Sequence, residues 1–167
     1  MDHPAAHLSA EITIARVVES QIPKALDLLT RAFGSTEEEL KKNESMMREQ
    51  FDDKARKIST FVAVKDNDVI GMIRCYPNKA GSSNYVVSDV IVTEAFRNRG
   101  LGRHMMKFIE DHIAQQCLKG NKGAVILGDS IKDTRPESTF YEKLGYTPHP
   151  DLPVFDGKPL LQKILNR

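Results

Sequence analysis

The sequence predicts one α/β domain, in which helices pack on a mixed β-sheet. A chain of 167 residues has the usual length of a single domain, since domains typically have roughly 100–200 residues. Its composition, 40% hydrophobic and 28% charged, is that of a folded globular protein rather than a disordered chain. Stretches with alternating apolar residues and stretches with helical apolar spacing follow one another in the order β-α-α-β-β-β-α-β-α-β.

The first part of the chain predicts one strand and two helices. Apolar residues alternate over residues 12–18, which indicates a strand. A helix is expected to begin at Ser20, with Pro23 in its first turn, and to end at Gly34. Residues 36–57 are rich in charge but carry one apolar stripe at helical spacing, so we expect a second helix with one buried face.

A hairpin and a third strand are expected next. Residues 61–64 and 69–76 have the composition of strands, and the Asp-Asn-Asp sequence at 66–68 is typical of the turn between them. Residues 77–84 are rich in glycine and serine and are expected to form a loop. The apolar run at 85–92 then predicts a further strand.

The last part of the chain predicts two more helices and two more strands. Apolar residues mark one face of a long helix over residues 101–117, and Gly120 is expected to end it. A strand is expected at 124–127. A capping box opens a short helix over residues 134–144, and the final apolar run at 160–165 predicts the last strand.

Charge and composition exclude several classes of protein. The 24 lysines and arginines nearly balance the 23 acidic residues, so the chain is not a strongly basic nucleic-acid-binding protein. Cys75 and Cys117 are too few for a disulfide framework or a zinc site, and we expect no metal. No window approaches the ~18 apolar residues of a membrane span.

The start of the chain is expected to be a loose leader over residues 1–10, before a domain of residues 11–167. It lacks the basic segment and apolar run of a signal peptide. The cytoplasm is therefore the expected compartment.

The most informative segment joins the strand at 85–92 to the long helix. Between residues 94 and 107 the net charge is +3, although the whole chain has only +1. The first turn of a helix leaves about four backbone N–H groups unpaired, and the helix dipole favours an anion there. Gly100 and Gly102 would let a phosphate approach the backbone, and Arg97, Arg99 and Arg103 add positive charge.

Two common phosphate-binding motifs do not fit this segment. A P-loop requires Gly-Lys-Ser/Thr, and none follows Gly102. A Rossmann turn requires three spaced glycines and an acidic residue ~20 positions further on. The segment has too few glycines, and its strand follows a hairpin in the middle of the chain.

Two motifs resemble the GNAT superfamily, the acyl-CoA-dependent N-acyltransferases. Residues 97–102 read Arg-Asn-Arg-Gly-Leu-Gly and match the family signature Gln/Arg-x-x-Gly-x-Gly/Ala. Residues 140–146 read Phe-Tyr-Glu-Lys-Leu-Gly-Tyr and resemble a second signature, Phe/Leu-Tyr-x-Lys-x-Gly-Phe/Tyr at a helix end. The order of elements from residue 12 to residue 165 is also similar to the family's.

The resemblance implies a central, mostly antiparallel mixed sheet with helices on both faces. Its fourth and fifth strands would splay apart, and acyl-CoA would lie in the gap. The strand backbone would pair with the pantetheine arm, N–H groups from Arg97 through Arg103 would hold the pyrophosphate, and amides near Ile91 would polarise the thioester carbonyl. The implied CoA-binding residues are Val90, Ile91, Val92, Arg97, Asn98, Arg99, Gly100, Leu101, Gly102, Arg103, Ser138 and Tyr141.

The resemblance also implies catalytic residues. Tyr141 occupies the position from which many family members protonate the departing thiolate. Asp89 is a candidate general base because a charge within the apolar strand is costly unless it serves a purpose. Glucosamine-6-phosphate N-acetyltransferases have an acidic residue in a similar Asp-Val-x-Val stretch. Asp129 and a chain of water molecules are the alternatives.

One feature departs from the family pattern. Family members often have an asparagine between the fifth strand and the next helix, and residues 129–137 contain none. Thr134, Arg135 or Ser138 would have to take its place.

The function implied is transfer of an acetyl group from acetyl-CoA to a primary amine by direct attack. The acceptor is not identified by any motif, and a small molecule is slightly favoured over a protein. The alternative is a non-catalytic module that binds acyl-CoA as a sensor or interaction partner. No nucleic-acid or membrane partner is expected, and the oligomeric state stays open, although family members often form homodimers.

Overall fold

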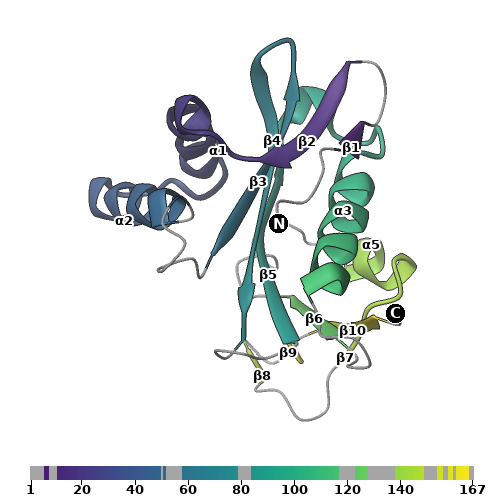
Figure 1. The fold of residues 1–167 in the computed structure, drawn as a ribbon. Helices are drawn as coiled ribbons and strands as arrows, with labels where there is room; N and C mark the ends of the chain where they lie inside the picture. The colour runs from purple at the N-terminus through teal and green to yellow at the C-terminus, as the bar shows by residue number, and fades with distance from the viewer. Residues whose placement is uncertain are drawn as a thin grey trace.

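An eight-stranded mixed sheet forms the centre of the computed structural model (Figure 1). The structure describes residues 6–7, 11–49, 51, 58–78, 84–116, 123–127, 138–148, 154–155, 158–159 and 161–165. In spatial order the strands are β1 (Ala6–His7), β2 (Ile12–Arg16), β3 (Ser59–Lys65), β4 (Asp68–Pro77), β5 (Asn84–Val92), β6 (Gly123–Leu127), β10 (Leu161–Leu165) and β7 (Thr147–Pro148). A separate ribbon pairs β8 (Val154–Phe155) with β9 (Lys158–Pro159).

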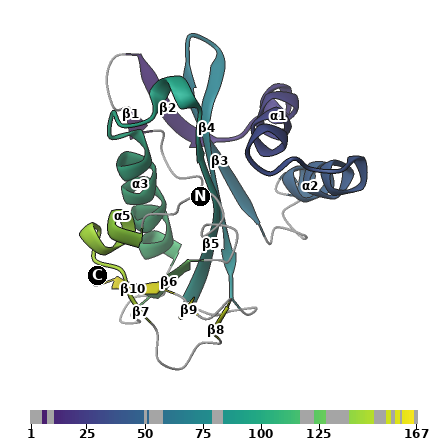
Figure 2. The same cartoon turned by 180° about the vertical axis from the view of Figure 1, so that it is seen from behind.

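Helices cover both faces of the sheet, as expected (Figures 1 and 2). One face carries η1 (Glu19–Gln21), α1 (Ile22–Phe33) and α2 (Glu37–Glu49), and the other carries α3 (Leu101–Gln116) and α5 (Ser138–Lys143). Each face has its own apolar cluster, one containing Leu29 and Met72 and the other Phe61 and Met105. None of the described helices is long and apolar enough to cross a membrane.

Local sequence explains the ends of the first two helices. Gly34 has φ 64° and donates its N–H to the carbonyl of Thr30 at 2.8 Å, which ends α1 where the sequence predicts. Thr36 and Glu39 form a reciprocal capping box at the start of α2. The described part of α2 ends at Glu49, and most of the rest of its predicted span lies outside the described residues.

Gly71 lets the long helix α3 lie close to the centre of the sheet. A Cβ at this position would stand 2.9 Å from the sulfur of Met105 and 3.2 Å from the carbonyl oxygen of Ile91. Only glycine therefore fits without displacement of the helix or of β5.

Two predicted boundaries need correction. Ala6–His7 were placed in a loose leader, but they form β1 and pair with Ile14 and Thr13 of β2. The pairing satisfies backbone groups that β2 would otherwise expose at the sheet edge. The helix expected to begin at Ser20 begins instead as the 3-10 turn η1, and its α-helical part starts at Ile22.

β5 and β6 are the parallel pair of the sheet, and the expected splay of these two strands stays a prediction, because the structure describes β6 only as far as Leu127. Four residue pairs join the two strands, from Asn84↔Ala124 to Val87↔Leu127. β5 then continues to Val92 without a further partner among the described residues of β6. All other neighbouring strands in the sheet are antiparallel.

Candidate functional site

The turn between β5 and α3 leaves backbone donors pointing out of the start of a helix. After Val92 the chain forms the 3-10 turn η2 (Glu94–Phe96), and Asn98 and Gly100 then take positive φ angles of 61° and 84°. The first helical hydrogen bond runs from the N–H of His104 to the carbonyl of Gly100, at 3.1 Å. The N–H groups of the three preceding residues, 101–103, therefore lack an intrahelical acceptor and can bind an anion.

A hollow of about 200 Å³ lies against this turn. It is lined by Val92, Phe96, Arg97, Asn98, Gly100, Leu101, Gly102, Arg103 and Phe140. Pockets that enclose a whole small ligand typically measure about 300–1,000 Å³. The hollow can therefore enclose a phosphate group or diphosphate, while the remainder of a longer ligand would extend outside it.

Arg97 lines the hollow and also holds the turn. Its backbone N–H donates to the carbonyl of Glu94 at 3.2 Å, and its Nε donates to the carbonyl of Val92 at 3.0 Å. Both groups stabilise the turn itself, so the row of free N–H donors does not begin at Arg97. Arg99 lies over the ring of Phe96, 5.5 Å from its centre, and Arg103 is exposed, so these two cations stay near the hollow.

Tyr141 lies on α5 beside the hollow. Its neighbour Phe140 lines the hollow, and the two rings meet edge to face with their centres 4.9 Å apart. Tyr141 is only 2% exposed, and its carbonyl accepts the N–H groups of Leu144 and Tyr146. The phenol is therefore held in a fixed, largely dehydrated position. Ser138 belongs to the same helix, but its side chain lies outside the described residues.

A second buried tyrosine has a purely structural environment. The hydroxyl of Tyr146 donates to Glu110 Oε2 at 3.1 Å, and Lys163 Nζ donates to Glu110 Oε1 at 2.7 Å. Burial, and then the neighbouring Glu110, raise the pKa of Tyr146 above its ordinary value. This cluster joins α3, β10 and the segment that follows α5, and the ring centre of Tyr146 is 6.0 Å from that of Tyr141. Nothing in the sequence pattern identified Glu110 or Lys163.

Asp89 lies at an irregularity in β5. Met72 pairs with Ile91 and Arg74 with Ser88, so Asp89 and Val90 both stand opposite one residue of β4. Asp89 has φ 55°, a left-handed conformation that costs a non-glycine residue about 1–3 kcal/mol. The surrounding contacts must therefore hold it.

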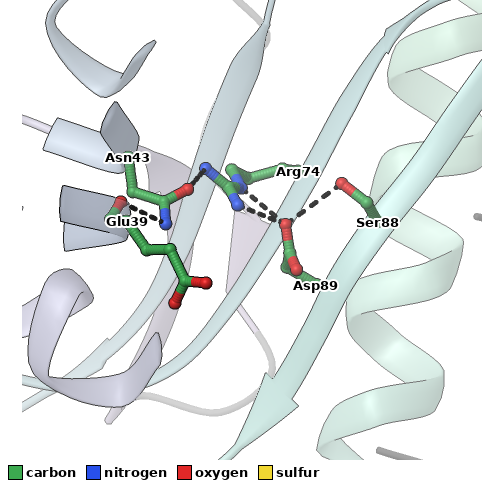
Figure 3. Close-up of polar contacts among 5 residues, drawn as sticks. All are labelled: Glu39, Asn43, Arg74, Ser88 and Asp89. Carbon is green, nitrogen blue, oxygen red and sulfur yellow. Dashed lines mark hydrogen bonds and ion pairs between the residues drawn. The ribbon is translucent and has the colours of Figure 1, made fainter. Parts of the chain in front are cut away.

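The carboxylate of Asp89 forms a buried ion pair with Arg74 (Figure 3). Nε of Arg74 donates to Oδ2 of Asp89 at 2.8 Å, and NH2 donates to the same oxygen. Ser88 Oγ donates to that oxygen at 3.2 Å. The side chains of Arg74 and Asp89 are 8% and 9% exposed. Buried charges of this kind persist only with such a complete set of partners.

The remaining nitrogen of Arg74 contacts helix α2. NH1 donates to Asn43 Oδ1 at 2.9 Å, and Asn43 Nδ2 donates to the backbone carbonyl of Glu39, also at 2.9 Å (Figure 3). Sequence analysis did not select Arg74 or Asn43. The available signal was that Arg74, like Asp89, is a lone charge inside an otherwise apolar strand.

Most of the other candidate bases and nucleophiles are not among the residues that the structure describes. Asp129, Thr134 and Arg135 lie outside the described residues, as does Cys117. Cys75 is buried, and burial raises the pKa of its thiol to about 12. Because the thiolate is the reactive form, Cys75 is unsuited to nucleophilic catalysis.

Comparison with known proteins identifies a family. The model of the acetyltransferase (GNAT) family matches residues 22–146. No curated protein matches the chain significantly in sequence.

Several solved structures have a similar fold. An acetyltransferase of the GNAT family from Staphylococcus aureus Mu50 has 14% identity and a TM-score of 0.72, over 93% of this chain and 99% of that one. The GNAT family N-acetyltransferase YhbS from Escherichia coli, in complex with CoA, has 20% identity and a TM-score of 0.66, over 95% and 84%. An aminoglycoside 6′-N-acetyltransferase complexed with coenzyme A has 18% identity and a TM-score of 0.69, over 92% and 98%.

Proposed function

The chain belongs to the acetyltransferase (GNAT) family, and from this premise we propose that it transfers an acetyl group from acetyl-CoA to a primary amine. The observation that carries the proposal is the hollow at the start of α3. It combines three backbone donors, two nearby arginines and the end of β5 at Val92. A negatively charged, elongated cosubstrate such as acetyl-CoA matches that combination.

The residues around the turn would bind the cosubstrate in two parts. The N–H groups of Leu101, Gly102 and Arg103 would hold the diphosphate, with Arg99 and Arg103 supplying positive charge. The backbone of residues 90–92, beyond the last pairing with β6, would hydrogen-bond the pantetheine arm as an additional strand does. This division places the phosphates at the hollow and the thioester along β5.

The reaction requires attack by a neutral amine and departure of a thiolate. The amine nitrogen would attack the carbonyl carbon of the thioester, whose oxygen would be stabilised by amide donors near Ile91. The carbon–sulfur bond would then break, and Tyr141 would deliver a proton to the sulfur. An alkyl amine has a pKa near 10, so it must also lose a proton, which water can accept.

A small-molecule amine is the acceptor that we favour, and the experiment includes larger amines as well. Purified protein is incubated with acetyl-CoA and a panel of small amines, polyamines and peptides with a lysine or free N-terminus. Release of the free CoA thiol is followed with a thiol reagent. Thiol release that depends on both protein and amine is expected. Tight binding of acetyl-CoA without thiol release would favour a non-catalytic acyl-CoA-binding module.

A further inference from the structure

Arg74 connects three elements of the fold through one buried side chain. Its Nε and NH2 contact Asp89 on β5, and its NH1 contacts Asn43 on α2, while Arg74 itself lies on β4 (Figure 3). All three guanidinium nitrogens thus have a partner. A planar guanidinium with every nitrogen engaged has one orientation, and it imposes that orientation on the groups it contacts.

Asp89 transmits this orientation to the backbone of β5. The residue has a left-handed conformation at the bulge, two positions before Ile91. A bulge turns the following peptide groups relative to the regular strand. On both sides of the bulge β5 pairs with β4, as Arg74↔Ser88 and Met72↔Ile91, so β4 holds this part of β5 in place. The ion pair adds a side-chain contact between β4 and the bulge.

Asn43 in turn holds the guanidinium from the side of α2. Within α2 only Met47 is a buried residue, so the helix has few apolar contacts with the rest of the molecule. Asparagine is a poor helix former, yet Asn43 is in the middle of α2, where its amide oxygen accepts from Arg74 at 2.9 Å. Its amide nitrogen is bonded to the Glu39 carbonyl, which fixes the direction of that oxygen.

We propose that Arg74 is a positioning residue for acyl transfer: through Asp89 it holds the bulge that orients the amides of β5 toward the thioester, and Asn43 fixes its guanidinium. Asp89 then serves as the partner of Arg74 rather than as the general base. This inference rests on the proposed function. Changes at Asn43, Arg74 or Asp89 should therefore alter turnover and the polarisation of the thioester carbonyl. They should have little effect on the binding of the phosphates.

The first test removes the contact from α2 and leaves the ion pair intact. Asn43→Ala is compared with Glu44→Ala, which removes the exposed ion pair between Glu44 and Arg48 on the same helix. Turnover with an amine from the panel is measured beside acetyl-CoA affinity by calorimetry. Asn43→Ala is expected to lower kcat roughly tenfold, because small displacements of reacting groups have large effects on rate. Its acetyl-CoA affinity should stay within twofold of wild type, and Glu44→Ala should match wild type in both.

A spectroscopic measurement separates a positioning role from a merely structural one. Infrared spectra of acetyl-CoA labelled with carbon-13 at the thioester carbonyl report how strongly the bound carbonyl is polarised. The carbonyl band should move to lower frequency on binding to wild-type protein, and Asn43→Ala should lose part of that displacement. Asn43→Asp keeps an oxygen for NH1 of Arg74 but loses the donor to the Glu39 carbonyl, so it should restore part of kcat and part of the displacement of the carbonyl band.

A second pair of variants decides the role of Asp89. Asp89→Asn keeps an oxygen that can accept from Arg74 and tolerates the left-handed conformation. If Asp89 is a positioning residue, this variant should lose no more than about tenfold in kcat, and Arg74→Lys, which cannot contact both partners, should lose at least as much. A loss of about 10²–10⁴ in Asp89→Asn, with wild-type kcat in Arg74→Lys, would overturn the proposal in favour of a general base.

Failure of this inference differs from failure of the proposed function. If wild-type protein releases CoA thiol and folded Asn43→Ala shows unchanged kcat and an unchanged carbonyl band, Arg74 is not a positioning residue. If wild-type protein binds acetyl-CoA but releases no thiol with any amine, the proposed function fails, and the carbonyl band still decides whether Arg74 orients β5. If wild-type protein does not bind acetyl-CoA, both fail.

Discussion

Substitution of Gly100 by glutamate tests whether the start of α3 binds the phosphates of acetyl-CoA. Gly100 has φ 84°, so any other residue incurs a strain of roughly 1–2 kcal/mol. A Cβ here would meet nothing closer than a ring carbon of His104 at 3.9 Å, so space does not limit the substitution. Gly100→Ala therefore introduces the backbone strain without a charge and serves as the control. Gly100→Glu introduces the same strain and also a negative charge beside the proposed phosphate position.

The expected difference between the two variants follows from the added charge. Two like charges several ångströms apart near a protein surface repel by about 1–2 kcal/mol after screening by salt. Gly100→Glu should therefore bind acetyl-CoA about 5- to 30-fold more weakly than Gly100→Ala. Calorimetry gives both affinities, and circular dichroism checks that both variants are folded. Equal affinities of the two folded variants would refute the assignment of the phosphate site to this turn.

Three further predictions concern single residues. Tyr141→Phe, which keeps the ring and removes the hydroxyl, should lower kcat about 10²–10⁴-fold with little change in acetyl-CoA affinity; turnover equal to wild type, with the chemical step limiting, would exclude Tyr141 as the acid. Gly71→Ala should lower the free energy of unfolding in urea by about 1–3 kcal/mol, because its Cβ would displace Met105 or Ile91. Burial raises the pKa of Cys75 from 9.0 to about 12, so the unfolded chain releases a proton above pH 9 that the folded chain retains. Cys75 should therefore lower stability by about 1.4 kcal/mol per pH unit as pH rises from 9 toward 12, and Cys75→Ala should show a correspondingly smaller slope.

The turn proposed to bind phosphate could be located from the sequence because its determinants are local. Two glycines, three arginines and the start of a helix are consecutive in the sequence, and helix termini bind anions whatever the rest of the fold. The details still required the structure. The backbone N–H of Arg97 donates to Glu94 and its Nε to Val92, and no sequence pattern predicts that an arginine lining the hollow also holds the turn.

The environment of Asp89 could not be predicted because its determinants are far apart in the sequence. Its partner Arg74 is 15 residues away, and Asn43 is 31 residues from Arg74. Two opposite charges in neighbouring apolar strands suggest a pair only if the register brings them to the same face, and the bulge changes that register between Met72 and Arg74. His112 is a similar case: this polar residue of the long helix is buried, with the centre of its ring 4.8 Å from that of Phe61.

We therefore expect phosphate binding and orientation of the thioester to depend on different parts of the molecule. In the proposed site, binding of the phosphates would depend on the turn at residues 97–103, whose backbone is held by its own hydrogen bonds. Orientation of the thioester would depend on β5, whose bulge contacts Arg74 of β4. Changes in the turn should alter acetyl-CoA affinity first, while changes around Arg74 should alter turnover first. Weaker acetyl-CoA binding in Gly100→Glu, together with a lower kcat but unchanged affinity in Asn43→Ala, is the expected result. It would show that phosphate binding depends on contacts local in the sequence, whereas orientation of the thioester depends on contacts between distant residues.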